Sequence, residues 1–95
     1  MKKVQSKDVD EFYRVIVCLR DRREARLFLG DLLTKTEIDE FASRWHVVRM
    51  ITNGVPYTQI IRTTGLSSRT IARVARWVKK GKGGFKMVLR RTKKK

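Results

Sequence analysis

The chain is short, strongly basic and poor in residues that form covalent or metal cross-links. It has 95 residues, a formal net charge of +15, an apolar content of 41% and one cysteine, Cys18. A chain of this length forms one domain with a thin core, which burial against a second subunit would strengthen. The lone cysteine excludes an internal disulfide and lacks partners for a zinc site, so we expect it to be a small core residue.

The sequence shows neither a secretion signal nor a membrane anchor. The first residues, MKKVQSKDVDEF, lack the apolar stretch of a signal peptide. No window approaches the roughly 20 apolar residues that a membrane-spanning helix needs. We therefore expect a cytoplasmic protein that does not enter a membrane.

Charge is divided unevenly along the chain. Residues 1–40 contain nine basic and nine acidic side chains, whereas residues 41–95 contain fifteen basic side chains and no acidic one. Solubility alone would be served by an even spread, so this division indicates that the second half meets a polyanion, above all nucleic acid. An anionic membrane, an acidic protein and plain solubility are the alternatives.

The first half of the chain predicts three helices after a flexible segment of residues 1–6. Ser6 or Asp8 can cap a helix that runs to about Arg20. An aspartate or threonine followed three residues later by glutamate then predicts helices over residues 21–33 and 35–53. The apolar stripes of the three helices are Val9, Phe12, Tyr13, Ile16 and Leu19, then Ala25, Phe28, Leu29 and Leu32, then Ile38, Phe41, Ala42, Trp45 and Val48.

Further apolar residues lie outside these stripes on the first and third helices. They are Val15, Val17 and Cys18, then Val47, Met50 and Ile51. A helix that is apolar on more than one side is usually covered on more than one side. We therefore assign residues 7–53 to dimerisation, the alternative being that the different faces contact different helices of one subunit.

The second half predicts a helix-turn-helix over residues 57–80. Asn53-Gly54 ends the preceding helix and Pro56 opens a short one, Tyr57–Thr63. Gly65 supplies the turn, and Ser67 or Ser68 caps a helix that reaches Lys80. Four residues with three glycines then separate a last helix, residues 85–91, from a disordered basic tail, residues 92–95. Residues 7–91 are thus expected to form a single all-α domain of about six helices.

Three arginines share one face of the helix that follows the turn. On a wheel of about 100° per residue, Arg69, Arg73 and Arg76 lie within about 60° of one another. The opposite arc holds Ile71, Val74, Ala75 and Val78, as expected of a face that packs on a core. Arginine can donate two hydrogen bonds to the O6 and N7 atoms of a guanine. The pattern therefore predicts a helix that binds in the major groove of double-stranded DNA.

Other residues near the turn are suited to phosphate. The N-terminus of the first helix of such a unit lies at the DNA backbone, where Thr58 and Gln59 can donate hydrogen bonds. Lys79 and Lys80, with Lys82 and Lys86, are interpreted as phosphate contacts that give affinity without sequence information.

The motifs around the turn also resemble a known family. The chain contains Leu33-Thr34 with Glu37, then Arg44, a break at Gly54 followed by Tyr57, the run TGLSSRTIARV at 64–74, and GFKMVL at 84–89. These residues resemble the tryptophan repressor superfamily, and within it the YerC/YecD group. The resemblance covers residues 8–91.

The resemblance implies an all-helical, intertwined homodimer with its helix-turn-helix units on one side. It also implies a transcriptional regulator, here a repressor. By that similarity, Ser67, Ser68, Arg69, Thr70 and Ala72 face base edges.

The tryptophan site of the family is altered in this chain. The family holds the indole between two arginines, and Arg44, Arg73 and Thr34 match those arginines and a threonine from the partner chain. The family's glycine and serine of the recognition helix are replaced by Val74 and Trp77, which are bulkier. We therefore expect no tryptophan co-repressor, and we consider that Trp77 itself fills the cleft.

Two other functions were weighed. A sequence-tolerant nucleic-acid-binding protein, either DNA-compacting or associated with RNA or the ribosome, is the alternative, because the basic tail and the high charge favour it. An enzyme is not expected, since His46 is the only histidine and every Asp and Glu lies in residues 1–40. The sequence predicts no cofactor and no metal.

Overall fold

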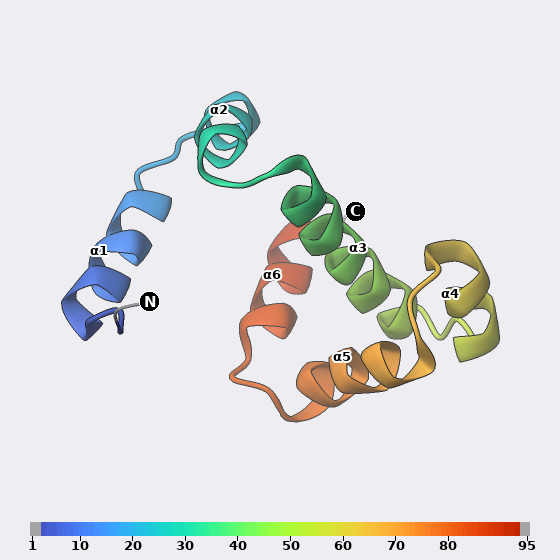
Figure 1. The fold of residues 1–95 in the computed structure, drawn as a ribbon. Helices are drawn as coiled ribbons and strands as arrows, with labels where there is room; N and C mark the ends of the chain where they lie inside the picture. The colour runs from blue at the N-terminus through green and yellow to red at the C-terminus, as the bar shows by residue number, and fades with distance from the viewer. Residues whose placement is uncertain (1–2, 94–95) are drawn as a thin grey trace. The chain divides into compact units, whose positions relative to one another are not determined.

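A computed structural model describes residues 3–93, which are helical throughout apart from caps and short connections (Figure 1). The helices are α1 (Ser6–Ile16), α2 (Arg22–Leu32), α3 (Lys35–Thr52), α4 (Tyr57–Thr64), α5 (Ser68–Lys80) and α6 (Gly84–Thr92). No strand is present in this range, so the predicted all-α class is confirmed. The predicted basic tail begins later than expected, because Thr92 belongs to α6, and Lys94 and Lys95 lie outside the described residues.

The chain divides into two compact units, and their boundary in the sequence lies between Ile38 and Asp39. The first unit contains α1 and α2. The second contains most of α3 with α4, α5 and α6, and it carries the predicted helix-turn-helix. The assignment of residues 7–91 to one domain stays a prediction.

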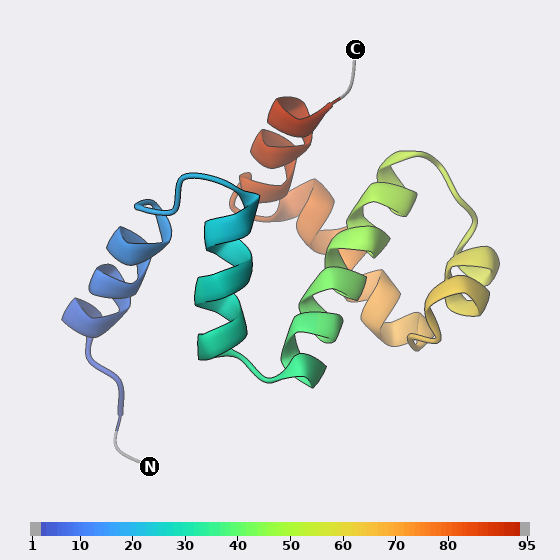
Figure 2. The same cartoon turned by 90° about the horizontal axis from the view of Figure 1, so that it is seen from above.

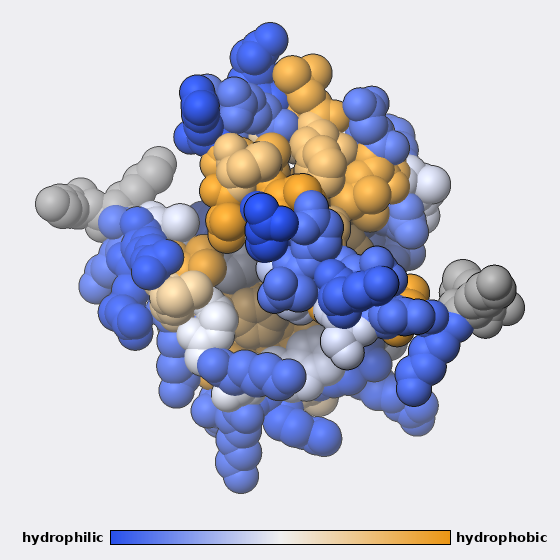
Figure 3. All heavy atoms as spheres, turned by 90° about the vertical axis from the view of Figure 1, so that its left-hand side faces the viewer, coloured by the Kyte–Doolittle hydropathy of each residue, from blue (hydrophilic) through white to orange (hydrophobic). Residues whose placement is uncertain are grey.

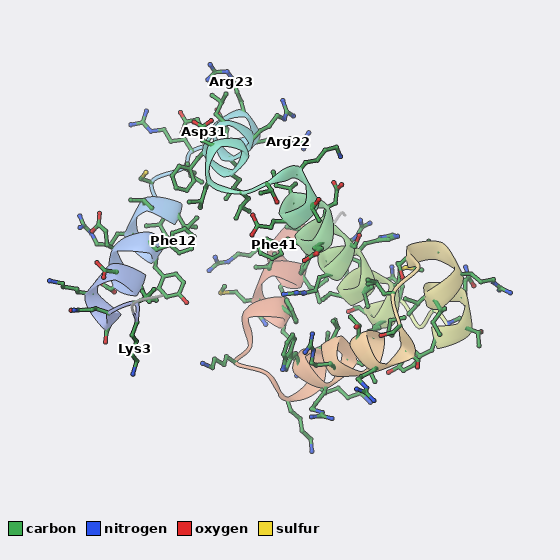
Figure 4. The ribbon with its side chains drawn as sticks, viewed as in Figure 1. Lys3, Phe12, Arg22, Arg23, Asp31 and Phe41 are labelled. Atoms are coloured by element: carbon green, nitrogen blue, oxygen red, sulfur yellow. The ribbon has the colours of Figure 1, made fainter. Side chains whose placement is uncertain are left out.

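The first unit buries none of its described apolar side chains fully, although Ile16, Ala25 and Phe28 are partly buried. Neither α1 nor α2 has a buried residue. Phe12 is 40% exposed, its ring lies 6.2 Å from that of Tyr13, and Figure 4 shows its side chain on α1. Cys18 is exposed as well, so its predicted place in the core of the chain is wrong.

Side-chain hydrogen bonds cap the starts of α2 and α3. The Asp21 side chain accepts a hydrogen bond of 2.9 Å from the Glu24 amide, which confirms the cap of α2. Thr34 and Glu37 form a reciprocal capping box at the start of α3, with bonds of 3.1 and 2.8 Å. For α1 the predicted cap is wrong, because Gln5 occupies the N-cap position and makes no side-chain hydrogen bond there.

Helix α1 also ends earlier than predicted. It stops at Ile16, four residues before Arg20. The amides of Cys18 and Leu19 bond to carbonyls only three residues back, at 3.2 and 3.3 Å. The β-branched run at residues 15–17 lowers helix propensity, which favours this tighter ending.

The second unit encloses the core. Figure 2 shows α5 crossing beneath α3, with α4 and α6 at its two ends. The buried apolar cluster consists of Val47, Val48, Met50, Ile60, Ile71 and Val74. Phe85 and Leu89 of α6 pack against this cluster, whereas Val88 is exposed. The start of α3 departs from its predicted stripe too, since Ile38 and Phe41 are exposed.

The turn between α4 and α5 depends on a left-handed glycine. Gly65 has φ 72° and ψ 4°, a region that costs an L-residue roughly 1–2 kcal/mol. Replacing Gly65 with alanine should therefore lower the free energy of unfolding by about 1–2 kcal/mol in denaturant titrations. The matched control is Gly30→Ala in α2, which has open space around it and no positive φ and should be neutral or stabilising. Equal effects of the two changes would contradict a role for the φ angle.

Candidate nucleic-acid interface

Helix α4 presents its first turn to solvent. Pro56 occupies the N-cap position, and Ile60 is fully buried beneath the helix. Thr58 and Gln59 are both exposed in the first turn, so their side chains are accessible to a phosphate.

The turn that follows is fixed by hydrogen bonds from one side chain. The Thr64 hydroxyl donates to the Ile60 carbonyl at 2.8 Å and accepts from the Leu66 amide at 3.2 Å. Gly65 reverses the chain between these two bonds. The turn thereby sets α5 against α4, with which it makes direct contacts.

Ser67, rather than Ser68, caps α5. The Ser67 hydroxyl accepts a hydrogen bond of 3.2 Å from the Thr70 amide and donates one of 3.0 Å to the Thr70 hydroxyl. Ser68 is the first residue of the helix and is exposed. Ser67 and Thr70 thus support the helix start, whereas Ser68 has its side chain in solvent.

Helix α5 has a buried face and a basic face, as predicted. Ile71, Val74 and Ala75 are buried against the core. Arg69, Arg73 and Arg76 are exposed, and so is the small residue Ala72 between them. Lys79 and Lys80 lie exposed in the last turn. Because no Asp or Glu follows Glu40 in the sequence, no acidic side chain of this segment offsets these charges.

Two arginines lie over aromatic rings of their own helices. The guanidinium carbon of Arg73 is 5.3 Å from the centroid of the Trp77 ring, and that of Arg44 is 5.6 Å from the centroid of Phe41. Both distances are within the range of a cation–π contact. The wheel projection did not predict either contact, although arginine and aromatic residues three or four positions apart on a helix were the available signal.

Trp77 also lines an apolar cavity of about 790 Å³ within the second unit. Its walls include Trp45 of α3 with Phe85, Met87 and Val88 of α6. Trp45 and Phe85 have ring centroids 6.2 Å apart. Figure 3 shows apolar side chains gathered among hydrophilic ones on the face of the molecule that it presents.

A second cavity, of about 970 Å³, has basic walls. It is lined by Arg49 of α3, by Lys86 and Arg90 of α6 and by Lys93, which follows α6; the other lining residues include Trp45 and Leu89. Of these basic residues the sequence interpretation assigned only Lys86 to phosphate, although Lys86 and Arg90 are four residues apart in α6 and so share one helical face.

Comparison with known proteins decides the family. The Trp repressor protein family model matches residues 7–93. The chain belongs to the Trp repressor family. It is 37% identical to the uncharacterized protein YerC of Bacillus subtilis over 91 residues, which are 96% of this chain and 88% of that protein. The resemblance to the YerC group noted from the motifs is thereby confirmed.

Solved structures of the family share the fold. A TrpR-like protein from Eubacterium eligens matches with a TM-score of 0.85 and 32% identity, covering 92% of this chain and 90% of that one. A candidate Trp repressor from Staphylococcus aureus matches with a TM-score of 0.83 and 34% identity, covering 92% and 87%. Membership in this family indicates a helix-turn-helix DNA-binding regulator.

The residues at the family's tryptophan-binding positions differ in burial and in contacts. Val74 is buried in the core, and Trp77 is 40% exposed beneath Arg73. Arg44 lies over Phe41.

Over residues 3–93, no cluster of histidine, cysteine, aspartate or glutamate is arranged to hold a metal ion, and no helix is long and apolar enough to span a bilayer.

Proposed function

We propose that the protein is a dimeric, sequence-specific regulator of transcription, a repressor, that binds double-stranded DNA through α4 and α5. The observation that carries the proposal is the exposed row of Arg69, Arg73 and Arg76 opposite a buried face on the second helix of the turn unit. A helix held in this way can enter the major groove while its far side stays packed on the core. A cytoplasmic, nucleoid-associated location follows from the proposal.

The residues divide between base and backbone roles. Ser68, Arg69, Ala72, Arg73 and Arg76 are placed to face base edges, with Ser67 and Thr70 at the start of the helix. The exposed residues Thr58 and Gln59 meet the phosphates beside the groove, as do Lys79 and Lys80. Backbone contacts hold the register of the protein on the duplex, and base contacts carry the sequence preference.

The exposed apolar residues support dimerisation. Helices α1 and α2 carry exposed apolar side chains, and so does α6, through Met87 and Val88. Exposed apolar patches of this kind mark interfaces. We propose that a second copy of the chain covers these surfaces, which places two α5 helices in one molecule.

The test is selection of bound duplexes from a random pool. We expect an enriched palindrome whose half-sites are about one helical turn, roughly 34 Å, apart. Recovery of unenriched sequences, despite tight binding, would refute sequence-specific regulation. A preference for a single, unrepeated half-site would refute the dimeric part of the proposal alone.

Arg69 should contribute directly to sequence preference. Replacing Arg69 with alanine should cost about 1–3 kcal/mol on the selected duplex and relax the preference at one base pair, as measured by competition binding. The matched control is Lys79→Ala, which should weaken selected and random duplexes alike and reduce the salt dependence by about one phosphate contact. An equal loss from Arg69→Ala on both duplexes would assign Arg69 to the backbone instead.

Tryptophan should not act as a co-repressor. Val74 and Trp77 add bulk where the family has a glycine and a serine, so we expect no micromolar binding heat in isothermal titration with tryptophan. The affinity for the selected duplex should also be the same with and without tryptophan. A clear saturable heat together with tighter DNA binding would overturn this expectation.

A sequence-tolerant nucleic-acid-binding function, DNA-compacting or associated with RNA or the ribosome, is the second candidate. The basic cavity formed by Arg49, Lys86, Arg90 and Lys93 favours it, because a polyanion of any sequence could occupy such a groove. Equal affinity for selected and random duplexes with a steep salt dependence would identify this function.

A further inference from the structure

Trp77 lies directly beneath one of the three arginines of the basic row. The guanidinium carbon of Arg73 is 5.3 Å from the centroid of the indole, one helical turn further along α5. The indole is 40% exposed, so it forms part of the surface instead of the core. A surface tryptophan at this position has no role in the packing of the buried face, which Ile71, Val74 and Ala75 supply.

We propose that Trp77 is a positioning residue that holds the Arg73 guanidinium in the orientation in which it reads a base pair. The inference rests on the proposed DNA-reading function of α5 and adds a residue that the sequence did not assign to DNA recognition. Arginine stacks on tryptophan through the flat face of the guanidinium. The N–H groups point outward in the plane of that group, so stacking leaves them available for a base or a phosphate.

The stack is favoured by what the surrounding sequence lacks. An arginine on a protein surface commonly turns toward a carboxylate, but no Asp or Glu follows Glu40. The neighbouring cations Arg69 and Arg76 repel Arg73 and offer it no hydrogen-bond acceptor. The electron-rich face of Trp77 offers Arg73 an attractive surface, and the structure places the guanidinium over it.

The backbone next to Trp77 follows a constrained path at the end of α5. The Trp77 carbonyl accepts a hydrogen bond of 2.8 Å from the Gly81 amide. A β-carbon at position 81 would collide with that same carbonyl, so the chain leaves the helix by a path that only glycine allows. The indole lies between Arg73 and the apolar cavity that it lines with Trp45 and Phe85.

A guanidinium that is held in its binding orientation before DNA arrives strengthens binding, because less side-chain entropy is lost in the complex. A free arginine loses side-chain rotational freedom when it engages a base, and a prepositioned one has already lost part of it. The advantage applies where one orientation is required, as in a two-bond contact with guanine. A phosphate contact accepts many orientations, so the indole should affect sequence discrimination more than total affinity.

The test combines Trp77→Leu with Arg73→Ala in a double-mutant cycle. Binding is measured on the selected duplex, on a duplex changed at the base pair that Arg73 reads, and on random DNA. Trp77→Leu should weaken binding to the selected duplex by roughly 2- to 30-fold, the range of a cation–π contact, and should leave random-duplex affinity and its salt dependence unchanged. In the Arg73→Ala background the same change should cost less than about twofold.

Two controls separate this role from a structural one. Trp77→Phe keeps an aromatic face and should recover most of the discrimination. A cycle of Trp77→Leu with Arg69→Ala should be additive within about twofold, because Arg69 lies on the far side of Arg73. Sedimentation and thermal unfolding should show an unchanged oligomer and fold in the variants used.

A spectroscopic measurement tests the stack in the unaltered protein. The side-chain protons of Arg73 should show upfield ring-current shifts that persist in the complex with the selected duplex. Ordinary arginine shifts in the complex, or additive effects in the Arg73 cycle, would overturn the inference and leave the proposed function intact. Absence of any preferred duplex for the wild-type protein would instead overturn the proposed function, and the inference with it.

Discussion

Replacing Ile71 with alanine is expected to lower the free energy of unfolding by about 2–5 kcal/mol. Ile71 is fully buried on the inner face of α5 and belongs to the cluster formed with Val47, Val48 and Ile60. Truncation removes apolar contact area and leaves a cavity that the rigid neighbours fill only in part. Small domains have roughly 5–15 kcal/mol of stability, so this change removes a large share.

Denaturant titration of the wild type, Ile71→Ala and Ile71→Val measures this effect. The valine variant removes one methylene group and should cost about 0.5–1.5 kcal/mol, which gives a graded series at one site. DNA binding by Ile71→Ala should fall only in proportion to the unfolded fraction, because the arginines lie on the opposite face. A loss of less than about 0.5 kcal/mol for both variants would show that α5 is not anchored by this residue.

Placing a carboxylate at position 12 is expected to separate the two subunits of the proposed dimer. Phe12 is an exposed aromatic residue on a helix with no buried side chain. In an interface, an aromatic side chain of this size commonly contributes about 2–4 kcal/mol, and a buried unpaired charge adds a penalty. Phe12→Asp should therefore shift the protein from dimer to monomer in analytical ultracentrifugation.

The loss of DNA affinity in Phe12→Asp should be larger than the loss of one side chain's contacts would cause. A dimer binds its second half-site at a high effective concentration, so its loss can reduce affinity by roughly 10²-fold or more. Gln5→Asp is the charge-matched control, because it adds the same carboxylate at the exposed N-cap of α1. An unchanged dimer mass in Phe12→Asp would contradict the assignment of α1 to the interface.

The helices and their caps could be predicted because their signals are local. Asp21 with Glu24, and Thr34 with Glu37, are close in sequence and form the bonds that their spacing indicates. Gly65 adopts the left-handed conformation that its place between two apolar segments requires. The end of α1 was not predicted, because stripe spacing continues through residues 17–19 while β-branched residues weaken the helix there.

The site could be predicted in part. Periodicity places Arg69, Arg73 and Arg76 opposite the buried residues of α5, and the structure has that arrangement. Periodicity predicts the direction of a Cα–Cβ bond and not the rotation of a long side chain, so it does not predict the cation–π contact of Arg73 with Trp77. Exposure of Phe12 and Phe41 was also missed, because a stripe indicates that a face is covered without indicating which chain covers it.

The exit at Gly81 sets the length of the helix that the proposed complex can use. Helix α5 has 13 residues, which corresponds to roughly 20 Å at 1.5 Å per residue. Arg69 and Arg76 are separated by about 10 Å along the axis, which fits within a major groove about 12 Å wide. Lys79 and Lys80 lie about 15 Å or more beyond Arg69, so the proposed complex has them past the groove, at the sugar–phosphate backbone. In the proposed complex, Gly81 therefore ends the helix just beyond the residues assigned to the phosphate backbone, after the residues assigned to bases.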